Sequence, residues 1–171
     1  MRIVGGRLAW RDLVSPRDWR VRPTAEPVRA ALLDALAADL PGARVLDLFA
    51  GTGALGLEAL SRGARWADFV EFRPTSLRAL KANIARLGVR DRARVRVADA
   101  LPFAGALPPD RYDVAFADPP YESRQLDRVL DAWRASGFSR VLAVEHAGAH
   151  PLPSGDRRLD FAHGAVTIYR R

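Results

Sequence analysis

The chain has 171 residues, 49% of them hydrophobic and 27% charged, which suffices for the core of one domain and is short for two. It has no cysteine, which excludes disulfides and thiolate metal sites, and no apolar run approaches the roughly 18 residues that cross a membrane. A net charge of +7 favours a polyanionic partner such as nucleic acid. We expect a single domain over 1–171, cytoplasmic and, by default, monomeric.

The N-terminal arm, residues 1–21, is basic and carries two tryptophans. Gly5–Gly6 between short alternating runs suggests a β-hairpin or an extended arm. Arginine forks bind phosphates and tryptophan can stack on splayed bases, so the candidate RNA-binding residues are Arg2, Arg7, Trp10, Arg11 and Arg17. The alternative is a solvated arm whose tryptophans pack on the domain.

The segment after the arm predicts a helix that packs on a sheet. Thr24 is a suitable N-cap, Glu26 lies in the first turn, and Pro27 is tolerated there because early helical N–H groups lack partners within the helix. One apolar stripe follows, formed by Val28, Ala31, Leu32, Ala35 and Leu36.

A glycine-rich turn follows the first predicted strand. Arg44–Leu48 has the apolar pattern of a strand buried on both faces of a parallel sheet. Gly51, Gly53 and Gly56 then open a helical pattern, and glycines before a helix N-terminus allow a ligand to approach the backbone closely. The motif alone is a weak indication of a cofactor site.

Two acids decide which cofactor suits this turn. Glu71 ends the next apolar run, where a ribose-hydroxyl acceptor is typical. Asp47 stands just before the glycines, where its charge would repel a pyrophosphate but would suit the cationic amino-acid end of S-adenosylmethionine. The pair favours a methyl donor over NAD.

The remaining patterns alternate between strand and helix. Strands are predicted at Ala67–Phe72, Arg94–Val97, Tyr112–Ala117 and Phe138–Val144, helices at Pro74–Leu87 and about Ser123–Ala135, a proline-rich loop at Pro102–Pro109, and a closing hairpin of Arg157–Ala162 and Ala165–Arg170 around His163–Gly164. This order predicts an α/β fold with a doubly wound, seven-stranded sheet that contains one antiparallel strand. Asp47, Glu71, Asp99 and Asp118 fall at strand ends and should therefore converge on one rim of the sheet.

The histidines do not form a metal-binding pattern. His146 and His150 are four residues apart, but Gly148 and Pro151 disfavour a helix there, so we expect loop histidines and no metal.

These motifs together resemble a known family. DLFAGTGALGLEAL, VEF, VADAL at Val97–Leu101 and DPPY at Asp118–Tyr121 look like a Rossmann-like class I S-adenosylmethionine-dependent methyltransferase that modifies amines. The opening MRIVGG and the segment RPTAEPVRAALLDAL are similar to the bacterial 16S ribosomal RNA guanine-N2 methyltransferases. The likeness runs from Met1 to the closing hairpin, although DPPY alone also occurs in DNA amino-methyltransferases.

The resemblance implies a role for each motif. The cofactor would lie against Arg22, Thr24, Asp47, Phe49, Ala50, Gly51, Thr52, Gly53, Glu71, Phe72, Asp99, Ala100 and Asp118. Asp99 would accept a hydrogen bond from the adenine amine, although it could instead only cap the turn that follows. The catalytic segment would be Asp118, Pro119, Pro120 and Tyr121.

The chemistry of the catalytic segment follows from its residue types. Two acceptors, the Asp118 carboxylate and the Pro119 carbonyl, could hold the two hydrogens of an aryl amine so that its lone pair points at the sulfonium methyl, while Tyr121 offers a stacking face. We expect methylation of guanine N2 in 16S ribosomal RNA, in an assembled or assembling small subunit. The alternatives are an adenine-N6 or cytosine-N4 amino-methyltransferase of DNA or other RNA, and a non-catalytic RNA-binding assembly factor.

Overall fold

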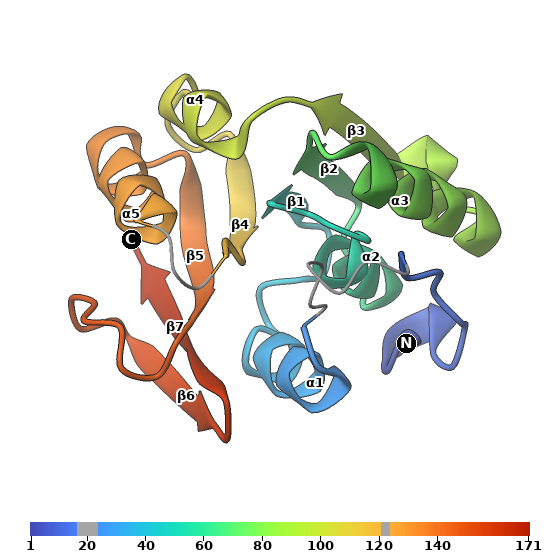
Figure 1. The fold of residues 1–171 in the computed structure, drawn as a ribbon, viewed down its shortest axis with the longest axis horizontal. Coiled ribbons are helices and arrows are strands. Elements are labelled where there is room, and N and C mark those ends of the chain that lie inside the picture. The colour runs from blue at the N-terminus through green and yellow to red at the C-terminus, as the bar shows by residue number, and fades with distance from the viewer. Residues whose placement is uncertain (17–23, 121–123) are drawn as a thin grey trace.

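The computed structural model describes residues 1–16, 24–120 and 124–171 and shows one seven-stranded sheet (Figure 1). The strand order is β3-β2-β1-β4-β5-β7-β6. The strands are β1 (Arg44–Leu48), β2 (Trp66–Glu71), β3 (Ala93–Val97), β4 (Tyr112–Ala117), β5 (Ser139–His146), β6 (Arg157–Phe161) and β7 (Gly164–Arg170). β7 runs antiparallel to both of its neighbours and β1–β5 pair in parallel, so the predicted doubly wound sheet with one antiparallel strand is confirmed.

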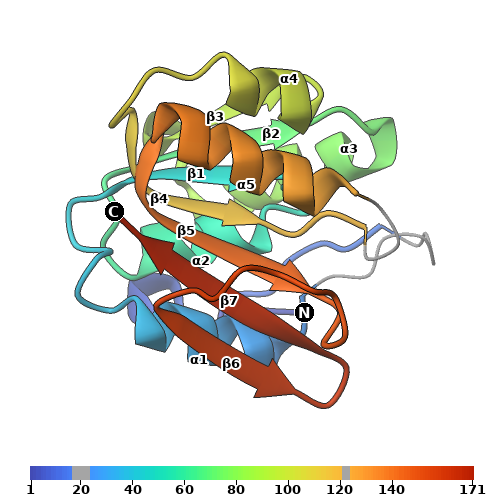
Figure 2. The ribbon, with the colours of Figure 1, turned by 90° about the vertical axis from the view of Figure 1, so that its left-hand side faces the viewer.

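Helices cover both faces of the sheet (Figure 2). They are α1 (Glu26–Ala35), α2 (Ala54–Ser61), α3 (Pro74–Leu87), α4 (Ala100–Gly105) and α5 (Gln125–Ser136). The core residues of α1, α2 and α3 share one apolar cluster with one face of the strands, whereas those of α4 and α5 share a second cluster with the other face. Successive side chains of β1 therefore alternate between the two clusters, with Val45 in the first and Leu46 in the second.

Three local predictions need correction. The segment expected to be a loop, 102–109, begins inside α4, because Asp99 caps that helix and Pro102 occupies an early position where a missing N–H costs little. The closing hairpin turns at Ala162–His163, one residue earlier than expected, since Gly164 already pairs with Phe161. His146 is not in a loop but lies buried in β5, where its Nε2 bonds the Thr167 hydroxyl at 2.8 Å.

The N-terminal arm folds back on the domain as a hairpin-like turn. Arg2 and Asp12 form an antiparallel bridge around a short 3₁₀ turn, Gly6–Leu8. Backbone hydrogen bonds between Met1 and Leu13, Ile3 and Arg11, and Ile3 and Trp10 join the same two segments, so the arm forms a short hairpin. The buried side chains of Ile3 and Leu13 join the core shared by α1, α2 and α3. The Asn83 side chain of α3 donates to the carbonyls of Val14 and of Thr52, each at 3.0 Å, and so ties the arm to the glycine-rich turn.

Candidate active site

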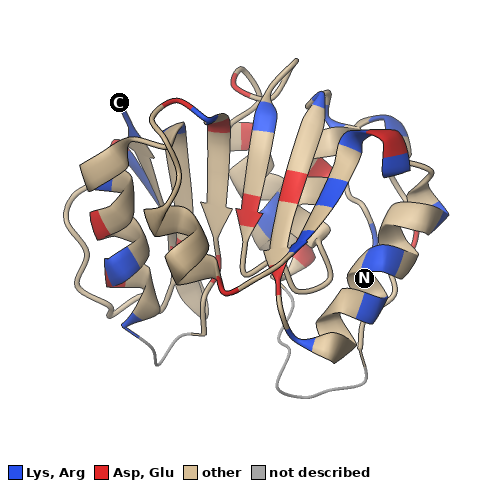
Figure 3. Cartoon of the chain, turned by 90° about the horizontal axis from the view of Figure 1, so that it is seen from above, with Lys and Arg blue, Asp and Glu red and all other residues tan. Residues whose placement is uncertain are grey.

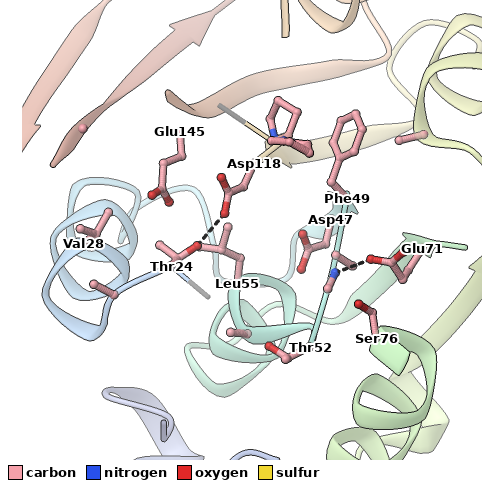
Figure 4. Close-up of a pocket in the computed structure, with 18 of the residues that line it drawn as sticks. Thr24, Val28, Asp47, Phe49, Thr52, Leu55, Glu71, Ser76, Asp118 and Glu145 are labelled. Carbon is pink, nitrogen blue, oxygen red and sulfur yellow. Dashed lines mark hydrogen bonds between the residues drawn. The ribbon is translucent and has the colours of Figure 1, made fainter. Parts of the chain in front are cut away.

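A pocket of about 630 Å³ opens at the carboxyl ends of β1, β2, β4 and β5 (Figure 4). This volume is in the range of small-molecule sites, and the position is where ligands bind in doubly wound sheets. Four acids line it: Asp47, Glu71, Asp118 and Glu145. Thr24 and Val28 close it on the α1 side, and the β6–β7 turn, Phe161–Ala165, adds a further wall.

The glycine-rich turn owes its shape to residues in left-handed backbone conformations. Gly51 has φ 55° and Gly53 has φ 81°, values that disfavour most side chains. A Cβ at Gly56 would lie 2.4 Å from the Phe69 ring, so a glycine lets α2 pack this closely on β2. The turn thereby presents the start of α2 to the pocket, where Thr52, Ala54 and Leu55 line the wall.

Asp47 lies under this turn. Its Oδ2 accepts a hydrogen bond from the Gly56 N–H at 2.9 Å, and the residue is only 2% exposed. Burial, together with the nearby charge of Glu71, raises the pKa of Asp47 to about 7, although the Gly56 bond opposes the shift. A cationic ligand group would favour the charged carboxylate, which suits Asp47 to an ammonium or sulfonium centre.

Glu71 holds the turn from the neighbouring strand. Its Oε2 accepts from the Gly51 N–H at 2.9 Å, and its Oε1 accepts from the N–H groups of Phe72 and Arg73, each at 2.8 Å. A carboxylate offers about four lone pairs, so these three bonds leave capacity for about one ligand hydroxyl. Glu71 therefore holds the glycine-rich turn in place and still has an acceptor site for a ligand hydroxyl.

Asp118 follows β4 and faces α1. The Thr24 hydroxyl donates to its Oδ2 at 3.0 Å across 94 positions of the chain (Figure 4). Burial raises the pKa of Asp118 well above its usual range, and the charges of Glu145 and Asp47 raise it further. A group with this environment is a candidate for chemistry, because donors on a ligand would stabilise its charged form.

The prediction that Thr24 caps the first helix is wrong. α1 begins at Glu26 after Ala25, and no side chain caps it, so Thr24 does not serve as the N-cap. The resemblance placed Thr24 at the pocket, and there its hydroxyl lies. The Arg29 guanidinium donates to the Thr24 carbonyl at 2.9 Å, which helps to fix the backbone of this segment.

Most of the predicted site residues line the one pocket. They are Thr24, Asp47, Phe49, Ala50, Gly51, Thr52, Glu71, Phe72, Ala100, Asp118, Pro119 and Pro120. Gly53 is not in the lining and acts through the backbone turn. Asp99 is also absent from it: its Oδ1 accepts from the Leu101 N–H at 2.9 Å, so the capping alternative is observed, while a contact with adenine stays a prediction. Arg22 and Tyr121 lie outside the described residues.

Sequence reasoning missed several parts of the wall. Glu145 was not among the predicted site residues. It lies within β5, one residue beyond the predicted end of that strand, and lines the pocket beside Asp118. The signal was present, because Glu145 belongs to the same series of acids near strand ends. Ser76, Gln125 and the β6–β7 turn carried no comparable signal, since only the assembled sheet brings them there.

The candidate RNA-binding residues lie apart from this pocket. The Arg2 guanidinium stacks 4.8 Å from the centre of the Trp10 ring, which is 67% exposed, and also pairs with Glu26 at 3.6 Å. Arg7 is exposed, and Arg11 donates to the Arg86 carbonyl at 2.7 Å. Further basic residues of α3 are exposed, namely Arg78, Lys81 and Arg86, the last of which contacts Arg11 (Figure 3). Arg17 lies outside the described residues.

Within residues 1–16, 24–120 and 124–171, no group of three or more His, Cys, Asp or Glu side chains is placed to hold a metal ion. None of the helices in that part of the chain is long and apolar enough to cross a membrane.

A family model and a curated relative both match most of this chain. The family described as "Conserved hypothetical protein 95" matches residues 1–156. The chain is 36% identical over 157 residues to the Escherichia coli K12 protein named ribosomal RNA small subunit methyltransferase D, covering 90% of this chain and 78% of that protein.

Solved structures share the fold of this chain. A hypothetical protein from Thermus thermophilus has a TM-score of 0.85 at 34% identity, over 100% of this chain and 99% of that one. An RNA methyltransferase from Salinibacter ruber, solved with S-adenosyl-L-homocysteine, has a TM-score of 0.66 at 18% identity, over 87% and 93% of the two chains. At that identity the likeness shows the fold alone.

Proposed function

We propose that this chain, which belongs to the conserved hypothetical protein 95 family, methylates the exocyclic N2 amine of a guanine in small-subunit ribosomal RNA, with S-adenosylmethionine as methyl donor. The observation that carries the proposal is the partly buried carboxylate of Asp118. It lines a cofactor-sized pocket, 3.0 Å from the Thr24 hydroxyl, and precedes two prolines that restrict the backbone.

The pocket suits the proposed methyl donor. Asp47 provides a negative charge for the cationic amino-acid end, Glu71 has capacity for a ribose hydroxyl, and Phe72, 54% exposed, offers an apolar face beside them. When bound, S-adenosylmethionine supplies an electrophilic methyl group. The protein has to hold the acceptor amine in line with that methyl group and exclude water, because alignment supplies much of the rate in such a transfer.

Asp118 and Pro119 would do this at the amine. An aryl amine is a poor nucleophile, since its lone pair is delocalised into the ring. An amine with one hydrogen bonded by the Asp118 carboxylate and the other by the Pro119 carbonyl would favour a pyramidal nitrogen whose lone pair points at the methyl group. Thr24 would hold the carboxylate in place, and the substrate hydrogens would favour its charged form.

The deciding experiment is to map methylated nucleotides by mass spectrometry in ribosomal RNA from a gene-deletion strain and from wild type. We expect one N2-methylguanine of the small subunit to disappear and to return when purified protein and S-adenosylmethionine are added to deletion-strain subunits. Loss of an adenine or cytosine methyl group instead would favour the alternative amino-methyltransferase activity. An unchanged methylation pattern would favour a non-catalytic assembly factor. Transfer to naked RNA but not to subunits would show that the assembled particle is not the substrate.

A further inference from the structure

Glu145 stands beside Asp118 on the neighbouring strand. β4 and β5 pair in parallel with Ala117 opposite Val144, so the next residues on the two strands, Asp118 and Glu145, are also neighbours. Adjacent strands are about 4.8 Å apart, which brings the two carboxyl groups to the same part of the rim.

Both side chains point to the same face of the sheet. Phe116 in β4 and Ala143 in β5 belong to the core cluster shared with α1, α2 and α3, and residues two positions further along each strand face the same way. Figure 4 shows Glu145 and Asp118 projecting into one space near Thr24. Glu145 lines the pocket, and its Oε2 is shielded from solvent. The charge of Glu145 contributes to the raised pKa of Asp118.

We propose that Glu145 reads the Watson–Crick edge of the target base by accepting a hydrogen bond from guanine N1–H, while Asp118 and the Pro119 carbonyl hold the N2 amine. The inference rests on the proposed function. Guanine presents an N1–H donor next to its N2 amine, so two adjacent carboxylates match adjacent donors. Adenine carries a lone pair at N1, which a carboxylate in this position repels.

This arrangement also accounts for placing two acids together. Two neighbouring carboxylates disfavour each other's charge, and N–H donors that bond both of them offset that repulsion. An incoming guanine supplies such donors, whereas a base with an acceptor at N1 supplies fewer and adds repulsion. Selection for guanine would then arise within the catalytic pocket, separately from any contact made by the N-terminal arm.

The test compares two bases at the mapped position. Small subunits are reconstituted from ribosomal RNA that carries either guanine or 2,6-diaminopurine there; the analogue keeps the 2-amine but has an acceptor at N1. Single-turnover methyl transfer is measured for wild type, Glu145→Gln and Glu145→Asp, with Asp131→Asn, which removes an exposed charge on α5, as control.

We expect wild type and Asp131→Asn to prefer guanine by at least about tenfold. Glu145→Gln should slow transfer to guanine by about ten- to a hundredfold and reduce the preference, because its amide can donate to N1 of diaminopurine. Glu145→Asp should be slower than wild type but keep the preference. Thermal unfolding and affinity for S-adenosylhomocysteine identify any variant that fails through folding or cofactor binding. If Glu145→Gln fails in either way, the comparison of the two bases is made with Glu145→Asp.

Two results would overturn the assignment of Glu145 while leaving the proposed function intact: an unchanged preference for guanine in Glu145→Gln, or faster transfer to guanine in that variant. The second would mean that Glu145 only raises the pKa of Asp118. Failure of the proposed function shows differently, as absence of transfer to guanine by the wild-type protein, and it would remove this inference as well.

Discussion

Two carboxyl groups on the same side of the sheet, Glu58 fully buried and Asp118 partly buried, have opposite surroundings. Glu58 in α2 is fully buried and is met by donors: the N–H groups of Val4 and Gly5, the Arg62 guanidinium at 3.3 Å, and Arg29 at 3.9 Å. Asp118 accepts one hydrogen bond, from the Thr24 hydroxyl, and its charged neighbours are the acids Glu145 and Asp47. The protein itself supplies the hydrogen-bond and ionic partners of Glu58, which holds the arm in place. For Asp118 we propose that the substrate supplies the missing donors.

The largest effect should come from removing the charge of Glu58. Glu58→Gln leaves the fully buried Arg29 without its carboxylate and weakens the attachment of the arm, so we expect a loss of about 3–5 kcal/mol in the free energy of unfolding, measured by urea denaturation. Asp34→Asn is the matched control, because Asp34 also pairs with Arg62 but is 70% exposed; it should cost about 1 kcal/mol or less. Equal losses in the two variants would remove the distinction between the buried and the exposed acid.

Asp118→Ala should leave stability nearly intact and act on the chemistry. It removes a charged acceptor from the substrate amine, an interaction of about 1.5–3 kcal/mol, so single-turnover transfer should slow by about ten- to a hundredfold. Cofactor titration of the same variant should give wild-type affinity. A wild-type transfer rate, or a failure that follows only from weakened cofactor binding, would contradict the role of Asp118 as amine acceptor.

The wild-type pH profile gives a second test of Asp118. Its pKa is raised, so the carboxyl is protonated at low pH and cannot accept a hydrogen bond there in its charged form. The transfer rate should therefore rise with pH through a value well above the usual carboxyl range, and Asp118→Ala should flatten that rise. A profile already flat from about pH 5 upwards in wild type would show that the amine does not depend on the ionisation of Asp118.

Glu71 is intermediate between Glu58 and Asp118, because it both holds the backbone of the glycine-rich turn and lines the pocket. Glu71→Ala releases the Gly51 N–H and removes the proposed ribose acceptor, which is worth about 1.5–3 kcal/mol, so calorimetry should show S-adenosylmethionine bound about ten- to a hundredfold more weakly. Thermal unfolding of the ligand-free variant separates loss of the tether from loss of the ligand contact. Wild-type affinity would remove Glu71 from the cofactor site.

Local sequence patterns predicted the parts of this site that depend on neighbouring residues. The glycines after β1 and the acids at the ends of β1, β2 and β4 follow from chain-local rules, and their convergence follows from the parallel sheet. Thr24 shows where such rules fail: its local pattern is that of a helix cap, but Asp118, 94 positions away, takes its hydroxyl. The hairpin turn was misplaced for a similar reason, because His163–Gly164 suits a turn locally while pairing of β6 with β7 sets the register. The role of Glu145 likewise depends on the pairing of two strands that are separated by α5 in the sequence.

The smallest expected effect concerns the exposed side of the arm that Glu58 docks. If arm arginines bind phosphates, replacing Arg2, Arg7 and Arg11 with alanine should flatten the dependence of RNA affinity on salt, by about 0.7–0.9 in the log–log slope for each phosphate that is no longer neutralised. The full sum over three residues is not expected, since Arg2 already pairs with Glu26 and Arg11 bonds the Arg86 carbonyl.

The control removes three exposed arginines from the far side of the domain, Arg128, Arg134 and Arg140, and should change the slope less. Affinity for S-adenosylmethionine should stay the same in both triple variants, because none of these residues lines the pocket. An equal change in slope in the two variants would mean that total charge, and not the arm, sets RNA affinity; an unaltered slope in the arm variant would make the arm a structural element alone.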